Sequence, residues 1–193
     1  MYPRVPFSQF LLARIRKDRE NLEKQIWMAA PDCLVDLEWT GGAAGHRPLD
    51  SLASDSWKRV GALPLWWGPK FGQAWFRFRL PEAVVRDYPW LAWRETGEAT
   101  LYVGGLPYAG FDPGHRYWRL PEAPGLLHVE STCISTGIWV PGHDAGIIGE
   151  DGSRVDAPML YRRNDDAWKA WIELELVEEW LRLMLRREDP DHE

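Results

Sequence analysis

The sequence predicts a mainly β fold, an antiparallel β-sandwich with an N-terminal and a C-terminal helix. Two patterns support this class. Apolar residues recur at helical spacing near both ends of the chain, whereas the segments between them alternate apolar and polar residues with a period of two. The alternating segments are short and are separated by Pro, Gly, Asp and Glu, which is typical of sandwiches, and a jelly roll is the arrangement we expect.

The N-terminal helix is predicted from Ser8 to Trp27, inside a first segment of residues 1–27. Ser8 can cap the first turn. Apolar side chains share one face, and charged side chains keep the other face in water. The apolar positions are Leu11, Ile15, Leu22 and Ile26.

The sandwich is predicted over residues 28–163, because the period of two is confined to this part of the chain. Its predicted strands span residues 74–80, 90–94, 99–103, 116–120, 126–131 and 138–140. Two stretches, residues 29–56 and 142–158, lack the alternation and are predicted as surface loops or insertions. The length of 193 residues fits one domain of ordinary size.

A β-hairpin is predicted where GEATLYVGG is followed by LPYAG. Side chains alternate over residues 99–103, and Gly104 and Gly105 can adopt the positive backbone angles of a tight turn. Pro107 lacks an amide hydrogen and is expected to end the pairing.

The C-terminal helix is predicted from Asn164 to Arg187, within residues 164–193. Asn164 can cap it, acidic residues occupy its first turn and arginines its last, as the helix dipole favours. Its apolar face is wide. We interpret this face, with Trp168, Trp171 and Trp180, as a docking surface, and ordinary core packing is the alternative.

Composition excludes several classes of function. The net charge is −6, and acidic and basic residues are spread along the chain, so nucleic acid and anionic membrane are not expected partners. Arginine and lysine interrupt the N-terminal apolar residues before any signal-peptide core forms, which indicates a cytoplasmic protein. Cys33 and Cys133 fit no metal motif; two buried free thiols are the simpler interpretation, and a disulfide is the alternative.

Thirteen tryptophans invite a carbohydrate-binding interpretation, because the apolar faces of sugars stack on indole rings. Trp66 and Trp67 are candidates, since neighbours on a strand face opposite ways. Trp139, beside a glycine-rich stretch, is another candidate. Most of the tryptophans are expected in the core or in an interface.

The segment FDPGHR gathers Asp112, His115 and Arg116, which could bind a polyol through charge-assisted hydrogen bonds. The alternative is a β-turn in which Asp112 caps its own backbone.

Glu95 and Glu98 could be an acid pair, but charged residues beside turns are usually solvated. The sequence shows no serine elbow, no phosphate-binding loop and no histidine pair at metal-ligand spacing, so neither catalysis nor a metal site is expected in this chain.

Taken in order, several features resemble the N-terminal region of α-mannosidases of glycoside hydrolase family 38, of the cytosolic and vacuolar type. These features are a charged helix ending in Ile26-Trp27, a Trp57 strand, Gly68-Pro69 before a Trp75-Phe76-Arg77 strand, the GEATLYVGG hairpin, the GFDPGHR loop and His128-Val129-Glu130. The resemblance implies a galactose-binding-like jelly roll that precedes a catalytic domain. In the family the catalytic domain carries a His-x-Asp metal motif, which this chain lacks.

The resemblance therefore implies a non-catalytic accessory domain, with no cofactor of its own. A divalent metal, zinc, is expected only in the catalytic domain, which is the implied partner in cis or as a separate chain. The domain would pack against that partner and support assembly or the access of sugar. The alternatives are an independent carbohydrate-binding module with a glycan as its partner, and a structural protein that forms a homo-oligomer.

Overall fold

A computed structural model describes residues 8–31, 36–69, 71–112, 114–134 and 152–188. The chain divides into two compact units. One unit, here called the helical unit, joins Met1–Met28 with Arg162–Glu193; the other, the β unit, is Ala29–Tyr161. The two predicted terminal helices therefore belong to a single unit, although they lie at opposite ends of the sequence.

The helices are α1 (Ser8–Ile26), the 3-10 helix η1 (Leu49–Leu52), α2 (Glu82–Asp87) and α3 (Asp165–Glu188). The strands are β1 (Trp27–Ala29), β2 (Glu38–Ala44), β3 (Lys58–Arg59), β4 (Leu65–Trp67), β5 (Gly72–Arg79), β6 (Trp90–Ala92), β7 (Glu98–Val103), β8 (Leu106–Phe111), β9 (Tyr117–Arg119), β10 (Leu126–Thr132), β11 (Ser153–Val155) and β12 (Met159–Arg163). The fold is mainly β, as the sequence predicts.

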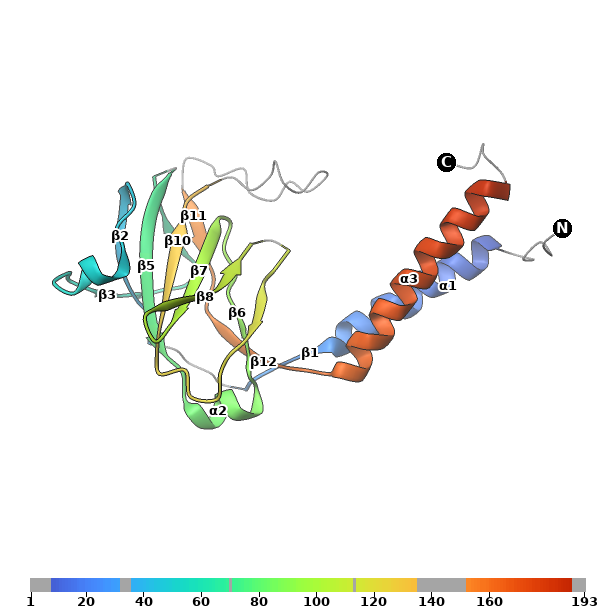
Figure 1. The fold of residues 1–193 in the computed structure, drawn as a ribbon, viewed down its shortest axis with the longest axis horizontal. Coiled ribbons are helices and arrows are strands. Elements are labelled where there is room, and N and C mark those ends of the chain that lie inside the picture. Colours follow the sequence, from blue (N-terminus) through green and yellow to red (C-terminus); the bar gives the residue numbers. More distant parts are fainter. Residues whose placement is uncertain (1–7, 32–35, 70, 113, 135–151, 189–193) are drawn as a thin grey trace. The chain divides into compact units, whose positions relative to one another are not determined.

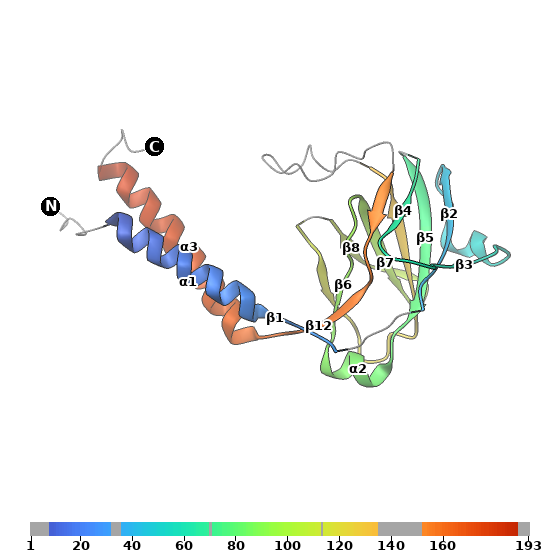
Figure 2. The same cartoon turned by 180° about the vertical axis from the view of Figure 1, so that it is seen from behind.

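The strands form three sheets. A six-stranded sheet has the order β3-β2-β5-β10-β7-β8, a four-stranded sheet has the order β1-β12-β6-β9, and β11 pairs with β4. Strands β5, β10, β7 and β8 run side by side, and each pair is antiparallel (Figure 1). The opposite view brings β4 and β12 to the front (Figure 2).

The two larger sheets share one hydrophobic core. Phe76 and Phe78 on β5 are buried, and Trp93, which follows β6, lies against both rings at centroid distances of 5.2 and 6.1 Å. Leu160 on β12 belongs to the same cluster. On β10 the side chains alternate strictly between buried and partly exposed. One face of the six-stranded sheet therefore covers the core, and the other is free for polar side chains.

Predicted strands over residues 74–80, 90–94, 99–103, 116–120 and 126–131 are confirmed by β5, β6, β7, β9 and β10. The strand predicted at 138–140 lies outside the described residues. Trp75 lies between Ala74 and Phe76 on β5 and therefore points to the opposite, polar face of the sheet. It is nevertheless 1% exposed, and its indole Nε1 donates to the Arg47 carbonyl at 2.9 Å. The segment before η1 thus covers part of that face.

The prediction of a surface loop over residues 29–56 is wrong, because this stretch contains β2 and η1. Strand β2 pairs with β5, and its register shifts between Gly41 and Ala43. Gly41 has a φ of 101°, and an added Cβ would lie 2.8 Å from the Gln73 carbonyl oxygen. The bulge needs glycine, and the glycines hide the alternation that marks a strand. In the stretch 142–158, the described part contains β11, so the loop prediction is also wrong there.

Pro107 does not end the hairpin. It lies within β8 and pairs with Tyr102, next to a register shift at Leu101. Strand β8 is at the edge of the sheet, where a missing amide hydrogen costs no ladder hydrogen bond. The hairpin therefore extends to Phe111, at the start of the candidate site.

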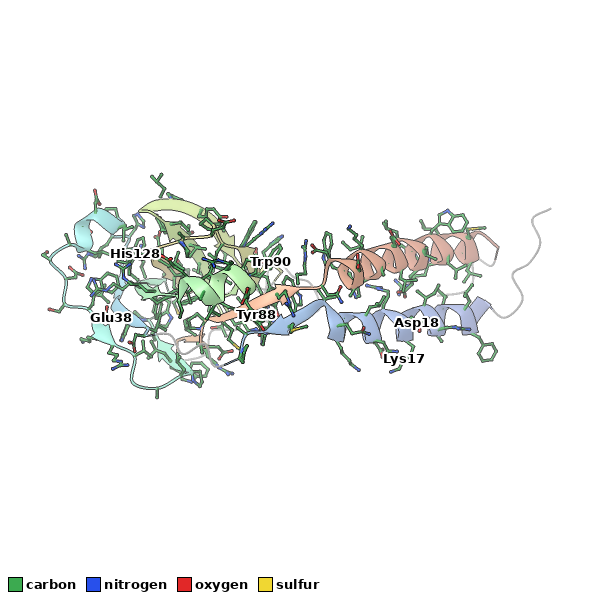
Figure 3. The ribbon with its side chains drawn as sticks, turned by 90° about the horizontal axis from the view of Figure 1, so that it is seen from below. Lys17, Asp18, Glu38, Tyr88, Trp90 and His128 are labelled. Atoms are coloured by element: carbon green, nitrogen blue, oxygen red, sulfur yellow. The ribbon has the colours of Figure 1, made fainter. Side chains whose placement is uncertain are left out.

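In the helical unit, α1 and α3 pack along one seam. On α3 the seam positions recur at spacings of three and four, as in a coiled coil. They are Ala167, Trp171, Leu174, Glu178 and Leu181. The Asn164 side chain accepts a hydrogen bond from the Ala167 amide at 3.2 Å, which confirms the predicted cap. Lys17 on α1 points away from α3 (Figure 3).

Glu178 is the polar member of this seam and is 1% exposed. Its carboxylate accepts hydrogen bonds from Arg16 at 2.8 Å and Arg19 at 2.6 Å, and also pairs with Arg182. The Arg19 guanidinium lies 4.7 Å from the Trp171 ring centroid. A polar layer of this kind fixes the register of the two helices.

Candidate acidic cleft

A cleft of about 470 Å³ opens on the polar face of the six-stranded sheet. We call it the acidic cleft, because three carboxyl groups line it. Its lining residues are Glu98, Ala99, Thr100, Gly110, Phe111, Asp112, His115, Trp118, Glu130 and Thr132.

Strand register places four polar side chains in the cleft. Thr100 on β7 pairs with Glu130 on β10, and Glu98 pairs with Thr132. Their neighbours Ala99 and Leu101 are buried on the opposite face. Because side chains alternate along a strand, these acidic and hydroxyl groups all point out of the core.

The aromatic side chain of Trp118 lies beside the edge strand β8. Gly110 on β8 lies opposite Thr100 and offers no side chain to fill the space. The Trp118 indole Nε1 donates to the Gly110 carbonyl at 2.6 Å, and the residue is 37% exposed. This hydrogen bond orients an accessible indole beside the carboxylates.

Asp112 organises the loop at one side of the cleft. One carboxylate oxygen accepts the amides of Gly114 at 2.6 Å and His115 at 2.8 Å, and the other lies 2.9 Å from His115 Nδ1. Burial alone would raise the pKa of Asp112, but the hydrogen bonds from His115 and Gly114 outweigh it and lower the pKa. The β-turn interpretation is correct for Asp112, and the turn holds both side chains at the cleft.

Glu130 is fixed by three neighbours. It accepts hydrogen bonds from Gln73 Nε2 at 2.5 Å and from the Tyr102 hydroxyl at 2.8 Å, and His46 Nδ1 lies 3.0 Å away. Burial, together with this carboxylate, raises the pKa of Tyr102 to about 12. Within the part of the chain that the structure describes, the Glu98 carboxylate has no such partner, so it is available to a ligand.

The remaining candidates lie elsewhere. Arg116 does not line the cleft. Trp66 is on β4, in the two-stranded sheet, and is 52% exposed. Trp67, its neighbour, is 4% exposed and packs edge-on against Phe76 in the core, so it offers no stacking platform. Trp139 lies outside the described residues.

The three candidate tryptophans of α3 also lie in different environments. Trp171 faces the seam under Arg19, and Trp168 lies under the Arg163 guanidinium at 4.2 Å. Only Trp180 among these three is strongly exposed, at 63%. The interpretation of all three as one docking face is therefore wrong, because Trp168 and Trp171 are half-buried and Trp180 lies about 180° around the helix from Trp171.

Glu95 is not solvated, contrary to the expectation for a charged residue beside a turn. The Glu95 carboxyl group is buried: Oε2 accepts hydrogen bonds from Trp93 Nε1 at 3.0 Å and from the Ser131 hydroxyl. Its Oε1 is buried without a hydrogen-bond partner among the described groups. Burial raises the pKa of Glu95 to about 8. With this pKa the carboxyl group is mostly neutral at pH 7.

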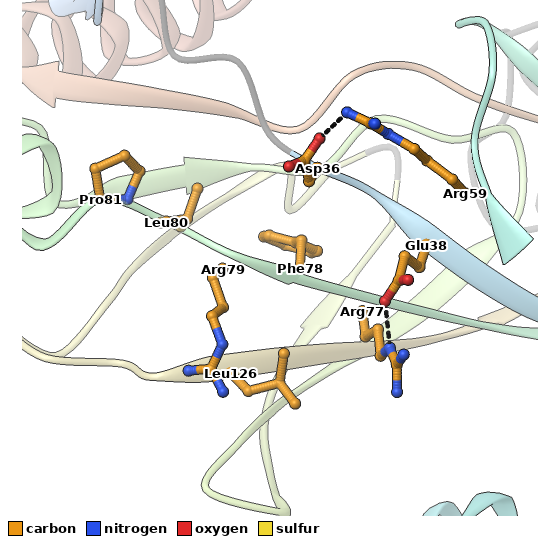
Figure 4. Close-up of a pocket in the computed structure, with 9 residues that line it drawn as sticks. All are labelled: Asp36, Glu38, Arg59, Arg77, Phe78, Arg79, Leu80, Pro81 and Leu126. Atoms are coloured by element: carbon orange, nitrogen blue, oxygen red, sulfur yellow. Dashed lines mark hydrogen bonds and ion pairs between the residues drawn. The ribbon is translucent and has the colours of Figure 1, made fainter. Parts of the chain in front are cut away.

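A second cleft, of about 630 Å³, lies at the other end of β5. Its acids are engaged: Asp36 pairs with Arg59, and Glu38 accepts a hydrogen bond from Arg77 at 2.6 Å (Figure 4). These ion pairs leave fewer free acceptors than the acidic cleft offers. We therefore take the acidic cleft as the candidate site.

The chemistry of the acidic cleft suits a polyol. Carboxylates accept hydrogen bonds from sugar hydroxyls, threonine hydroxyls both donate and accept them, and an indole stacks on apolar C–H faces. Across the described ranges, no three His, Cys, Asp or Glu side chains converge as they would around a metal ion. Nor does any described helix have the length and apolar character needed to cross a bilayer.

Comparison with known proteins adds no assignment. No family model matches the chain, and no curated protein matches it significantly. Any function must therefore be argued from the residues of the chain itself.

Proposed function

We propose that this chain is a non-catalytic accessory domain of an α-mannosidase of glycoside hydrolase family 38, and that its acidic cleft binds a mannose-containing glycan. One observation carries the proposal: two of the segments on which the resemblance rests meet at this cleft. The GEATLYVGG hairpin supplies Glu98 and Thr100, and the GFDPGHR loop supplies Asp112 and His115. Loops placed by a rigid sheet are common positions for binding residues.

In this proposal the β unit is a galactose-binding-like jelly roll. Two antiparallel sheets around one core support that topology. The partner is a catalytic mannosidase domain, in cis or as a separate chain, which supplies the zinc ion and the nucleophile. The domain packs against that partner, and the acidic cleft holds sugar near the point of access.

A second function is favoured because the cleft is complete within the β unit. All of its lining residues lie between Glu98 and Thr132, inside the β unit. Such a cleft can bind glycan without any other domain, as an independent carbohydrate-binding module does. The two functions differ in whether binding needs the catalytic partner.

Calorimetric titration of the full chain with α-linked mannose oligosaccharides tests the proposal. We expect dissociation constants in the roughly millimolar range, since the cleft is open and small. Trp118→Ala should weaken binding at least roughly tenfold, because it removes the stacking surface, and Glu98→Gln should weaken it several-fold.

Trp66→Ala is the matched control, since Trp66 is exposed but outside the cleft, and it should leave binding unchanged. Equal losses for Trp66→Ala and Trp118→Ala, or no binding with and without a catalytic domain, would contradict a role of the cleft in binding.

The chain alone should not hydrolyse an aryl α-mannoside; saturable hydrolysis would contradict the accessory role.

A further inference from the structure

Helix α3 carries a second apolar stripe. Its members, here called the outer stripe, are Leu176 at 66% exposure, Val177 at 47%, Trp180 at 63% and Leu183 at 58%. Three of them, Leu176, Trp180 and Leu183, recur at spacings of four and three, as on the contact face of a coiled coil. Exposed apolar side chains grouped in this way indicate an interaction surface.

The outer stripe lies on the side of α3 opposite to the α1 seam. Leu176, Trp180 and Leu183 each follow a seam residue by two positions: Leu174, Glu178 and Leu181. Two residues turn an α-helix by about 200°, so α1 cannot cover both faces. A covering surface for the outer stripe must come from another molecule or another domain.

We propose that the outer stripe binds the same stripe of a second copy of this chain, with the two α3 helices antiparallel. The stripe has a two-fold pattern centred between Glu179 and Trp180. Leu176 and Leu183 flank the centre, and Glu173 and Arg186 lie three residues beyond them. An antiparallel pair places Leu176 against Leu183 of the other copy, and Glu173 near its Arg186.

Charge favours this arrangement over a parallel one. A parallel pair would set Glu173 against Glu173, and would also align the two helix dipoles. Near the centre of the antiparallel pair, each copy brings Glu179, whose carboxylate is already paired with Arg182 of its own helix at 2.5 Å. Each contact is made twice by the two-fold axis, which is the usual symmetry of a homodimer.

Sedimentation of the full chain over a range of concentrations tests the interface. We expect a reversible dimer, and Trp180→Glu should raise its dissociation constant at least roughly tenfold, because Trp180 lies at the centre of the contact. Phe10→Glu is the matched control: Phe10 on α1 is exposed to a similar degree, at 65%, but lies off the outer stripe. It should leave the dimer unchanged.

A charge exchange tests the orientation. Glu173→Arg and Arg186→Glu should each weaken the dimer several-fold at low salt, and the double variant should restore it, because only the antiparallel pair joins these two positions. Helical circular dichroism should be unchanged throughout. A chain that remains monomeric at every concentration, a dimer unaffected by Trp180→Glu, or a double variant without recovery would each overturn the proposal. The sugar titration is independent of all three outcomes.

Discussion

Replacing Glu95 with glutamine is expected to flatten the pH dependence of the stability of the β unit. The wild-type carboxyl group has a pKa of about 8 in the folded state, because it is buried between Trp93 and Ser131. In the unfolded chain its pKa is about 4.3. The folded state therefore binds one more proton between these two values.

This extra proton determines the direction in which stability changes with pH. The stability contributed by neutral Glu95 is complete below about pH 4.3, decreases as the pH rises, and is lost above about pH 8. We expect wild-type protein to lose on the order of 5 kcal/mol of unfolding free energy over this range through this group. Glutamine cannot ionise, so most of this loss should disappear.

Urea unfolding followed by tryptophan fluorescence at several pH values between 4.5 and 8.5 measures the effect. Glu122→Gln is the control, because Glu122 is an exposed carboxylate next to β9 and should leave the slope as in wild type. Parallel pH profiles for wild type and Glu95→Gln would show that Glu95 is ionised in the folded protein.

Glu95 also shows where sequence reasoning stops. Glu95 and Glu98 flank the same turn, and no local pattern separates them. Their fates differ because β7 begins at Glu98 and turns its side chain outward, whereas Glu95 precedes the strand and lies beneath Ser131. Tertiary packing thus overrides the usual solvation of a charged residue.

Helices and regular strands could be predicted because their signals are local. The cap joins Asn164 to Ala167, three residues away, and the apolar–polar alternation that marks β5 is read from adjacent residues. The sequence does not reveal strand β2, because Gly41 interrupts its pattern and the pairing that stabilises it comes from β5, 28 to 39 residues away in the chain.

In the candidate site, too, contacts between residues close in sequence could be predicted, and contacts between distant residues could not. Asp112 and His115 are three residues apart, so their association could be predicted from turn chemistry. Glu130 and Trp118 reach the cleft through strand register, because β10 pairs with β7 and the Trp118 indole bonds to Gly110. Register is set by the hydrophobic pattern of whole strands, and a single segment does not reveal it.

Replacing Glu178 with alanine is expected to destabilise the helical unit by about 2–3 kcal/mol. The change removes the buried carboxylate that accepts hydrogen bonds from Arg16 and Arg19 and leaves the Arg19 guanidinium without its main partner in the seam. Burial alone would raise the pKa of Glu178, but these arginines lower it. Its stabilising effect should therefore persist above the unfolded pKa of about 4.3 and vanish as the pH falls through the lowered value.

Urea unfolding followed by helical circular dichroism measures this loss. Glu20→Ala removes an exposed acid that pairs with Lys17 of its own helix, and should leave the transition in place. The double variant Glu178→Leu with Arg19→Leu should recover stability, since matched apolar residues often replace a buried ion pair without loss. Recovery would identify the loss of the buried partner of Arg19 as the cause of the alanine defect. Equal stability of Glu178→Ala and wild type would show that the carboxylate is solvated rather than part of the seam.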